Sequence, residues 1–187
     1  MFLEKLKEFP KNKILILITI IAFLSFLLIQ VIVMGPIESV LKSTTGYGVL
    51  EFEFAWVPEV INNIFTAWGL DGIAKETFVT YIDFLYLLSY SIFGFGLVLI
   101  PIRLSEGKLQ EVGLFMSLTP LIAGVFDVIE NINLLIMLGN PSSFQSFIPF
   151  VASLSAVLKF GFLLIGIIFF VITLLIMLIG RLKKKTE

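Results

Sequence analysis

Residues 112–138 read VGLFMSLTPLIAGVFDVIENINLLIML, an apolar segment long enough to cross the hydrocarbon core of a bilayer as one helix. Polar residues interrupt it near its end, at Asp127, Glu130 and Asn131. These positions are spaced i, i+3 and i+4, so on a helix they share one face. An ionised side chain at membrane depth costs about 2.5–3.5 kcal/mol on insertion scales and usually faces the interior of a bundle. The segment therefore predicts a helix bundle with a polar interior site.

The composition of the whole chain is that of a membrane protein. Of its 187 residues, 58% are hydrophobic and 14% are charged, whereas soluble domains average about 45–50% and about 25%. Besides residues 112–138, three apolar segments are long enough to span a bilayer, at about 14–34, 80–100 and 148–179. We expect a single all-α domain over residues 1–187, an integral membrane four-helix bundle.

The residue types that are missing limit the chemistry. Net charge is −1, so no basic field attracts nucleic acid. Cysteine and histidine are both absent, which excludes thiolate catalysis and the commonest transition-metal ligands. A metal site in this chain would use oxygen ligands and would suit a hard cation such as Ca²⁺ or Mg²⁺.

Basic residues are unevenly distributed among the segments that join the spans. Residues 1–13 hold four, 101–111 hold two and 181–187 hold four, whereas 35–79 hold two and 139–147 hold none. Because cytoplasmic loops carry the excess of lysine and arginine, both termini are expected in the cytoplasm, with the protein in the cell membrane. Residues 35–79 then form an extracytoplasmic loop.

That outer loop is predicted to carry an amphipathic helix over residues 57–68, where apolar side chains recur at helical spacing. Pro58 suits its first turn and Gly69 its C-terminal cap. The polar face lacks the lysine and arginine of lipid-surface helices, which favours a lid over the bundle rather than a helix lying on the membrane.

Three smaller expectations concern breaks and turns. The alternation in residues 50–54, LEFEF, is typical of a short strand. Gly35-Pro36 is expected to end the first transmembrane helix, because proline lacks a backbone donor and restricts the residue before it. Thr119-Pro120 is expected to kink the third.

Polar residues of all four spans fall at a similar depth. Counting about twenty residues from each cytoplasmic boundary, at 1.5 Å of rise per residue across a core of about 30 Å, reaches Asp83, Asn131 and the neighbour of Lys159. Gln30 lies near that level in the first helix. On the second helix, Asp83, Tyr86 and Tyr90 share one face. We therefore expect one polar layer near the outer membrane boundary.

The predicted site gathers these residues around Lys159 as counter-ion. Its ligand-binding members are Asp83, Tyr86, Tyr90, Asp127, Glu130, Asn131 and Lys159. Their carboxylates outnumber the single lysine, and a surplus of negative charge calls for a cation, a raised pKa or open water. Ion pairs such as Asp127–Lys159 are also compatible with a purely structural role that pins the helices together.

Three functions fit this pattern. The first is a membrane protein whose outward-facing site binds a cation or the head of a polar, lipid-like ligand. The second is a lipid-active enzyme of the isomerase or hydrolase type, with Glu130 as acid–base group, Asp127 as its partner and Asn131 as orienter. The third is a non-enzymatic tetraspan scaffold or accessory subunit, working as a homo-oligomer or beside another membrane protein.

Overall fold

The computed structural model describes residues 2–186, which are 85% helical and include no strand. Four of its helical segments are long and apolar enough to cross a membrane: Asn12–Thr45, Pro58–Ile102, Gly107–Gly139 and Ile148–Gly180. In chain order the elements are α1 (Phe2–Lys5), α2 (Asn12–Ile29), the π-helix η1 (Gln30–Met34), α3 (Gly35–Thr45), α4 (Val49–Glu53), α5 (Pro58–Ile102), α6 (Gly107–Met116), α7 (Thr119–Gly139) and α8 (Ile148–Thr186). The all-α prediction is confirmed.

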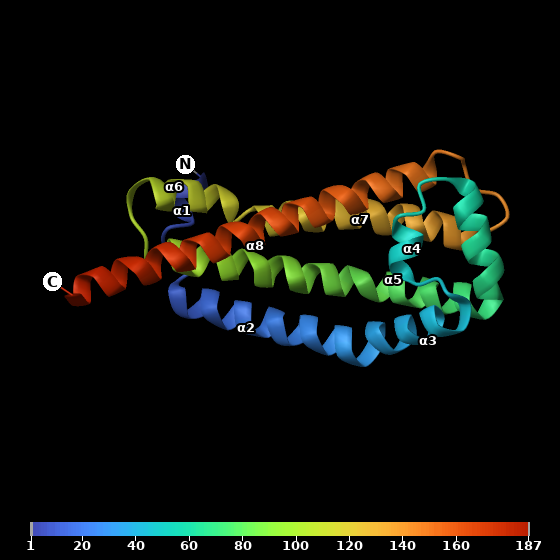
Figure 1. Cartoon of the computed structure of the whole chain (residues 1–187), viewed down its shortest axis with the longest axis horizontal. Coiled ribbons are helices and arrows are strands. Elements are labelled where there is room, and N and C mark those ends of the chain that lie inside the picture. Colours follow the sequence, from blue (N-terminus) through green and yellow to red (C-terminus); the bar gives the residue numbers. More distant parts are fainter. Residues whose placement is uncertain (1, 187) are drawn as a thin grey trace.

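The long helices lie roughly side by side in an elongated bundle (Figure 1). α2 packs on α5, α5 on α7, and α7 on α8. The bundle has two distinct ends. One, which we call the termini end, carries α1, α6 and the last turns of α8; the other, the loop end, carries the α3–α4 loop, the first turns of α5 and the α7–α8 loop (Figure 1).

The first long helix does not end at Gly35-Pro36, so that prediction was wrong. It continues through η1 into α3 and ends at Gly46, whose φ of 81° forms a left-handed cap. Within η1 the N–H of Gly35 donates to the carbonyl of Gln30, an i→i+5 bond. This wider turn lets the helix continue past Pro36, the second residue of α3, instead of ending there.

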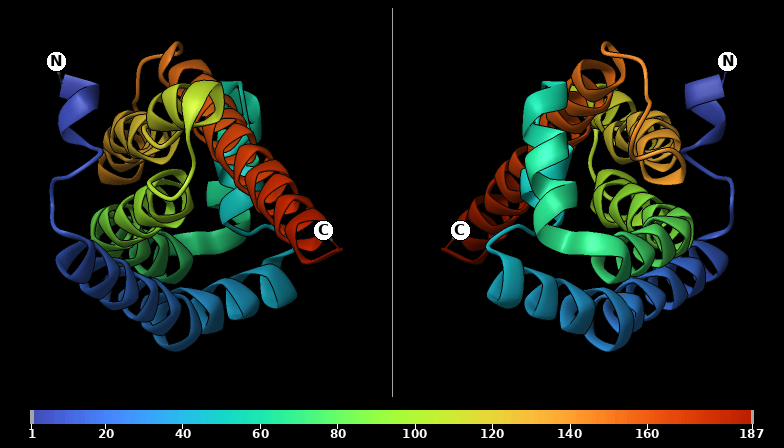
Figure 2. Two further views of the ribbon diagram at one scale, coloured as in Figure 1. Left: turned by 90° about the vertical axis from the view of Figure 1, so that its left-hand side faces the viewer. Right: turned by 90° about the vertical axis from the view of Figure 1, so that its right-hand side faces the viewer.

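The predicted amphipathic helix forms the first turns of α5 and ends at Gly69 as expected. Gly69 has φ 59° and ψ −171°, a conformation that favours glycine, and the chain turns there before the helix resumes. In Figure 2 this segment crosses the ends of the long helices. Ile61, Ile64 and Trp68 are buried against the ends of α7 and α8, so the segment covers the loop end of the bundle. The second long helix thus begins soon after Gly69, earlier than the predicted residue 80.

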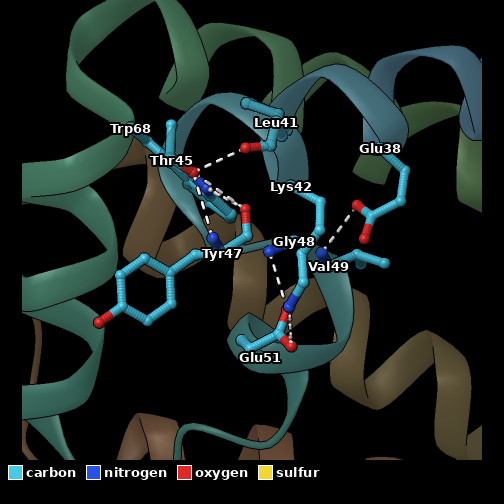
Figure 3. Close-up of polar contacts among 9 residues, drawn as sticks. All are labelled: Glu38, Leu41, Lys42, Thr45, Tyr47, Gly48, Val49, Glu51 and Trp68. Atoms are coloured by element: carbon cyan, nitrogen blue, oxygen red, sulfur yellow. Dashed lines mark hydrogen bonds and ion pairs between the residues drawn. The ribbon is translucent and has the colours of Figure 1, made fainter.

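The segment predicted as a strand at residues 50–54 is helical, because side chains satisfy the free N–H groups at its start. It forms α4, where Glu51 accepts a hydrogen bond from the Gly48 N–H at 2.8 Å and Glu38 accepts one from the Val49 N–H at 2.8 Å (Figure 3). Capping of this kind offsets the cost of starting a short helix. Lys42 pairs with Glu51, and this contact lowers the pKa of the Glu51 carboxyl.

The same loop is tied to the helix that covers the bundle. The indole N–H of Trp68 donates to the carbonyl of Tyr47 at 3.0 Å (Figure 3). Phe52, on α4, packs edge-on against Trp68 with ring centroids 5.2 Å apart. These contacts fix α4 against the bundle, and so they position Glu53, its last residue.

The third span is broken at Thr119-Pro120 rather than only kinked. α6 ends at Met116 and α7 begins at Thr119, with Pro120 in its first turn. Proline is tolerated in a first turn because no intrahelical partner awaits its N–H. The crossing segment predicted as residues 112–138 is therefore two helices, and all of its predicted site residues lie on α7.

Candidate functional site

A half-open cavity of about 420 Å³ lies between α2, η1, α4, α5, α7 and α8. Its polar lining gathers towards the loop end, where α4 and the first half of α5 lie. Its apolar lining extends towards the termini end along α5 and α8. Charged and hydrogen-bonding side chains in the lining are Gln30, Glu53, Glu76, Thr80, Asp83, Tyr86, Tyr90, Asp127, Asn131 and Lys159.

Lys159 of α8 stands among three carboxylates from two other elements. Its ammonium lies 2.8 Å from Glu130, 3.2 Å from Asp127 and 3.1 Å from Glu53. All four side chains are buried. α8 approaches α7 closely here because Ala152, Ser155 and Ala156, on the same face as Lys159, are small and buried. The predicted Lys159 counter-ion is thus in contact with both acids of α7.

Two further hydrogen bonds join α5 to α7. The hydroxyl of Tyr90 donates to Asp127 Oδ2 at 2.7 Å, and the side-chain amide of Asn131 donates to Asp83 Oδ2 at 2.6 Å. Asp127 therefore accepts from Tyr90 with one oxygen and from Lys159 with the other. Tyr90 and Asp127 thus belong to the cluster around Lys159, and Asp83 and Asn131 form a separate hydrogen-bonded pair.

Six of the seven predicted ligand-binding residues line the cavity: Asp83, Tyr86, Tyr90, Asp127, Asn131 and Lys159. Glu130, the seventh, is 0% exposed, contacts Lys159 and is not among the residues that line the cavity. The proposed acid–base group of an enzyme therefore does not face the cavity. Asp127, its proposed partner, is the acid of α7 that faces the cavity.

Sequence reasoning missed two acids of the site. Glu53 reaches Lys159 from α4, and Glu76 lines the cavity from the first half of α5. Both lie in the segment assigned to the outer loop, so neither was placed within the bundle. Burial raises the pKa of the Glu53 carboxyl, while the neighbouring Lys159 ammonium opposes that shift.

The arrangement does not resemble a metal site. Across the portion of the chain that the structure describes, no three acidic side chains converge closely enough to hold an ion. The ammonium of Lys159 occupies the point where Glu53, Asp127 and Glu130 meet. A hard cation would therefore have to displace Lys159 to gain those three ligands.

The rest of the cavity wall is apolar and rich in aromatic rings. Tyr86 stacks on Phe26 of α2 with ring centroids 5.0 Å apart, and Phe26 in turn stacks on Phe93 at 6.2 Å. On the other side, Phe160 and Leu163 of α8 complete the lining. Both views in Figure 2 show α8 apart from α2, with α5 and α7 side by side on one side of the bundle between them. The cavity thus combines a polar end with a long apolar body.

No protein-family model, no curated protein and no solved structure matches this chain. Its function is inferred from the cavity and the residues that line it.

Proposed function

We propose that this chain is an integral membrane protein that binds a lipid-like ligand in its interior cavity. The ligand's polar head lies among the cavity acids at the loop end, and its apolar part lies along α5 and α8. The observation that carries the proposal is a single cavity of about 420 Å³ with a charged end and an apolar, aromatic body. Ligand pockets are commonly 300–1,000 Å³ in size, with a few polar groups set in an apolar lining.

The geometry favours this ligand class over a bare cation, an enzyme and a scaffold. A bare cation would have to compete with Lys159 for three of the acids. An enzyme using Glu130 would need a substrate to reach an acid that does not line the cavity. A scaffold needs no cavity at all, since a structural ion-pair cluster is best stabilised by close packing. An amphiphile uses both halves of the space.

Blocking the apolar half tests the proposal. Leu163 lines the cavity, whereas its neighbour Leu164 is 57% exposed on the outer face of the same helix. We expect Leu163→Trp to lower occupancy by a copurified amphiphile at least about tenfold, because the indole fills space that the ligand's chain needs. Leu164→Trp, the matched control, leaves occupancy unchanged. Native mass spectrometry of protein released from its own membrane measures the bound mass directly.

Equal occupancy in the two variants, or no bound molecule in the unsubstituted protein under the same conditions, would contradict lipid binding in this cavity.

We also propose that the loop end faces outward and that both termini are cytoplasmic. The basic residues of segments 1–13, 101–111 and 181–187 support this orientation. Since the chain has no cysteine, the labelling of a single introduced cysteine shows on which side of the membrane that residue lies. We expect a membrane-impermeant maleimide to label Ser142→Cys, in the α7–α8 loop, in intact cells, and to label Glu106→Cys, between α5 and α6, only after lysis. The opposite labelling pattern would invert the topology.

A further inference from the structure

The acids around the cavity fall into two groups, according to whether Lys159 reaches them. Glu53, Asp127 and Glu130 lie within 3.2 Å of its ammonium. Glu76 and Asp83 also line the cavity, and no ion pair to either occurs among the side chains that the structure describes. Three acids share one cation, and two have none.

Glu76 is the more exceptional of the two. Its side chain is 1% exposed, it lines the cavity, and its Oε1 has no hydrogen-bond partner in the described structure. A buried polar atom without a partner costs about 1–3 kcal/mol, and more when it carries a charge. Such a group therefore points to a partner that the folded chain does not itself supply.

Asp83 lies two helical turns beyond Glu76 on the same face of α5, with Thr80 between them. One oxygen of Asp83 accepts the Asn131 amide. The hydroxyl of Thr80 donates to the backbone carbonyl of Glu76, so it is not available to donate a hydrogen bond to either carboxylate. Both acids thus belong to the face of α5 that lines the cavity.

Aromatic rings line the cavity next to Asp83, starting with Tyr86 one helical turn beyond it on α5. Tyr86 packs edge-on to Tyr90 with centroids 5.8 Å apart and stacks on Phe26 at 5.0 Å, and all three rings line the cavity. The face of an aromatic ring attracts a cation by about 0.5–2 kcal/mol, depending on how far the site is shielded from water. Carboxylates beside aromatic faces are the surroundings that an ammonium group prefers.

We propose that the ligand's head is cationic, so that the cavity binds amphiphilic amines, with Glu76 and Asp83 as the binding site of the ammonium group. This inference rests on the proposed function. It adds the charge of the head and the two acids that recognise it. The amine lies where these two carboxylates line the cavity, and its alkyl chain passes Tyr86 and runs along α5 towards Leu97 and Phe170, which line the apolar part of the cavity. Lys159 belongs to the protein's own cluster and repels an ammonium from Asp127.

Three probes of equal chain length separate the charge of the head from its hydrophobicity: dodecylamine, dodecanol and dodecanoate. With the protein in lipid nanodiscs at neutral pH, native mass spectrometry is expected to show dodecylamine retained at least about tenfold better than either other probe. Glu76→Gln and Asp83→Asn each lower dodecylamine retention about tenfold, because a charge-assisted contact is lost. Glu59→Gln, on the exposed face of the helix that covers the bundle, leaves retention unchanged.

Other results separate the inference from the proposed function. Suppose that the unsubstituted protein retains the three probes equally and that Leu163→Trp displaces all of them. Lipid binding in the cavity is then supported, and the proposed preference for a cationic head is wrong. If both Glu76→Gln and Asp83→Asn retain dodecylamine as well as the unsubstituted protein does, the assignment of these two acids as the ammonium-binding site is wrong. If no probe is retained in a way that Leu163→Trp abolishes, the proposed function fails and this inference fails with it.

Discussion

Lys159→Met is expected to lower the free energy of unfolding by about 3–5 kcal/mol, because it leaves buried carboxylates without their shared cation. Glu53, Asp127 and Glu130 are only 7%, 2% and 0% exposed, so little water solvates them in place of the ammonium. Methionine has a similar length, which keeps the loss of packing small. Unfolding in mixed micelles, titrated with dodecyl sulfate, measures the difference.

Two comparisons identify the cause of that loss. Lys75→Met removes an exposed ion pair with Asp71 on α5, and such pairs contribute only about 0.3–0.5 kcal/mol. Adding Glu130→Gln to Lys159→Met restores part of the stability, because one buried charge disappears with its partner. A loss no larger than that of Lys75→Met would show that the cluster does not hold the bundle together.

Gly96→Leu is expected to destabilise the bundle by about 1–3 kcal/mol through overpacking, and to lower ligand occupancy as well. Gly96 lies on α5 where α2 crosses, and even a Cβ atom there would come within 2.9 Å of the Thr19 Cβ. Because α2 packs chiefly on α5, a larger side chain pushes the whole of α2 outward. α2 contributes Phe26 to the cavity wall, so the site opens at the same time.

Gly161→Leu is the matched control for this substitution. Gly161 lies on α8, and a Cβ added there meets no atom within 4 Å. We expect its stability and ligand occupancy to equal those of the unsubstituted protein within about 0.5 kcal/mol. Equal behaviour of the two glycine variants would mean that α2 is not held against α5 as described.

Much of the site was predictable because helical geometry is regular. The i, i+3, i+4 spacing placed Asp127 and Asn131 on one face of α7, and counting from the basic boundaries placed Lys159 at the same depth. Lysine and acids at membrane depth have few options other than each other. The contacts of Lys159 with Asp127 and Glu130 confirm that inference.

The features that could not be predicted from the sequence lie mainly in the segment between the first two spans. A π-helix carries the first helix past Pro36, which no local pattern signalled. Capping by Glu38 and Glu51 made a helix of a segment whose alternation favoured a strand. These two departures bring α4 against α8, and only then does Glu53 meet Lys159. The cap from Glu51, three residues after Gly48, is a local signal that the alternation obscured, whereas the cap from Glu38 comes from outside the segment.

Glu130 illustrates a different limit. Its spacing placed it on the correct face of α7, yet periodicity does not tell how deep a side chain lies relative to its neighbours. Glu130 contacts Lys159 of α8 and does not line the cavity, whereas Lys159 does. Glu76 was missed for the converse reason, because it was assigned to a loop that proved to be helix. Whether a side chain lines the cavity depends on how several helices pack together, which the pattern of one helix does not show.

The most direct test of the central claim is an experimental density map of the unsubstituted protein in a lipid bilayer disc. The claim predicts an elongated molecule inside the cavity, with its head against Glu76 and Asp83 and its chain between α5 and α8. A map in which side chains fill this space, or in which the five acids point away from one another, would contradict it.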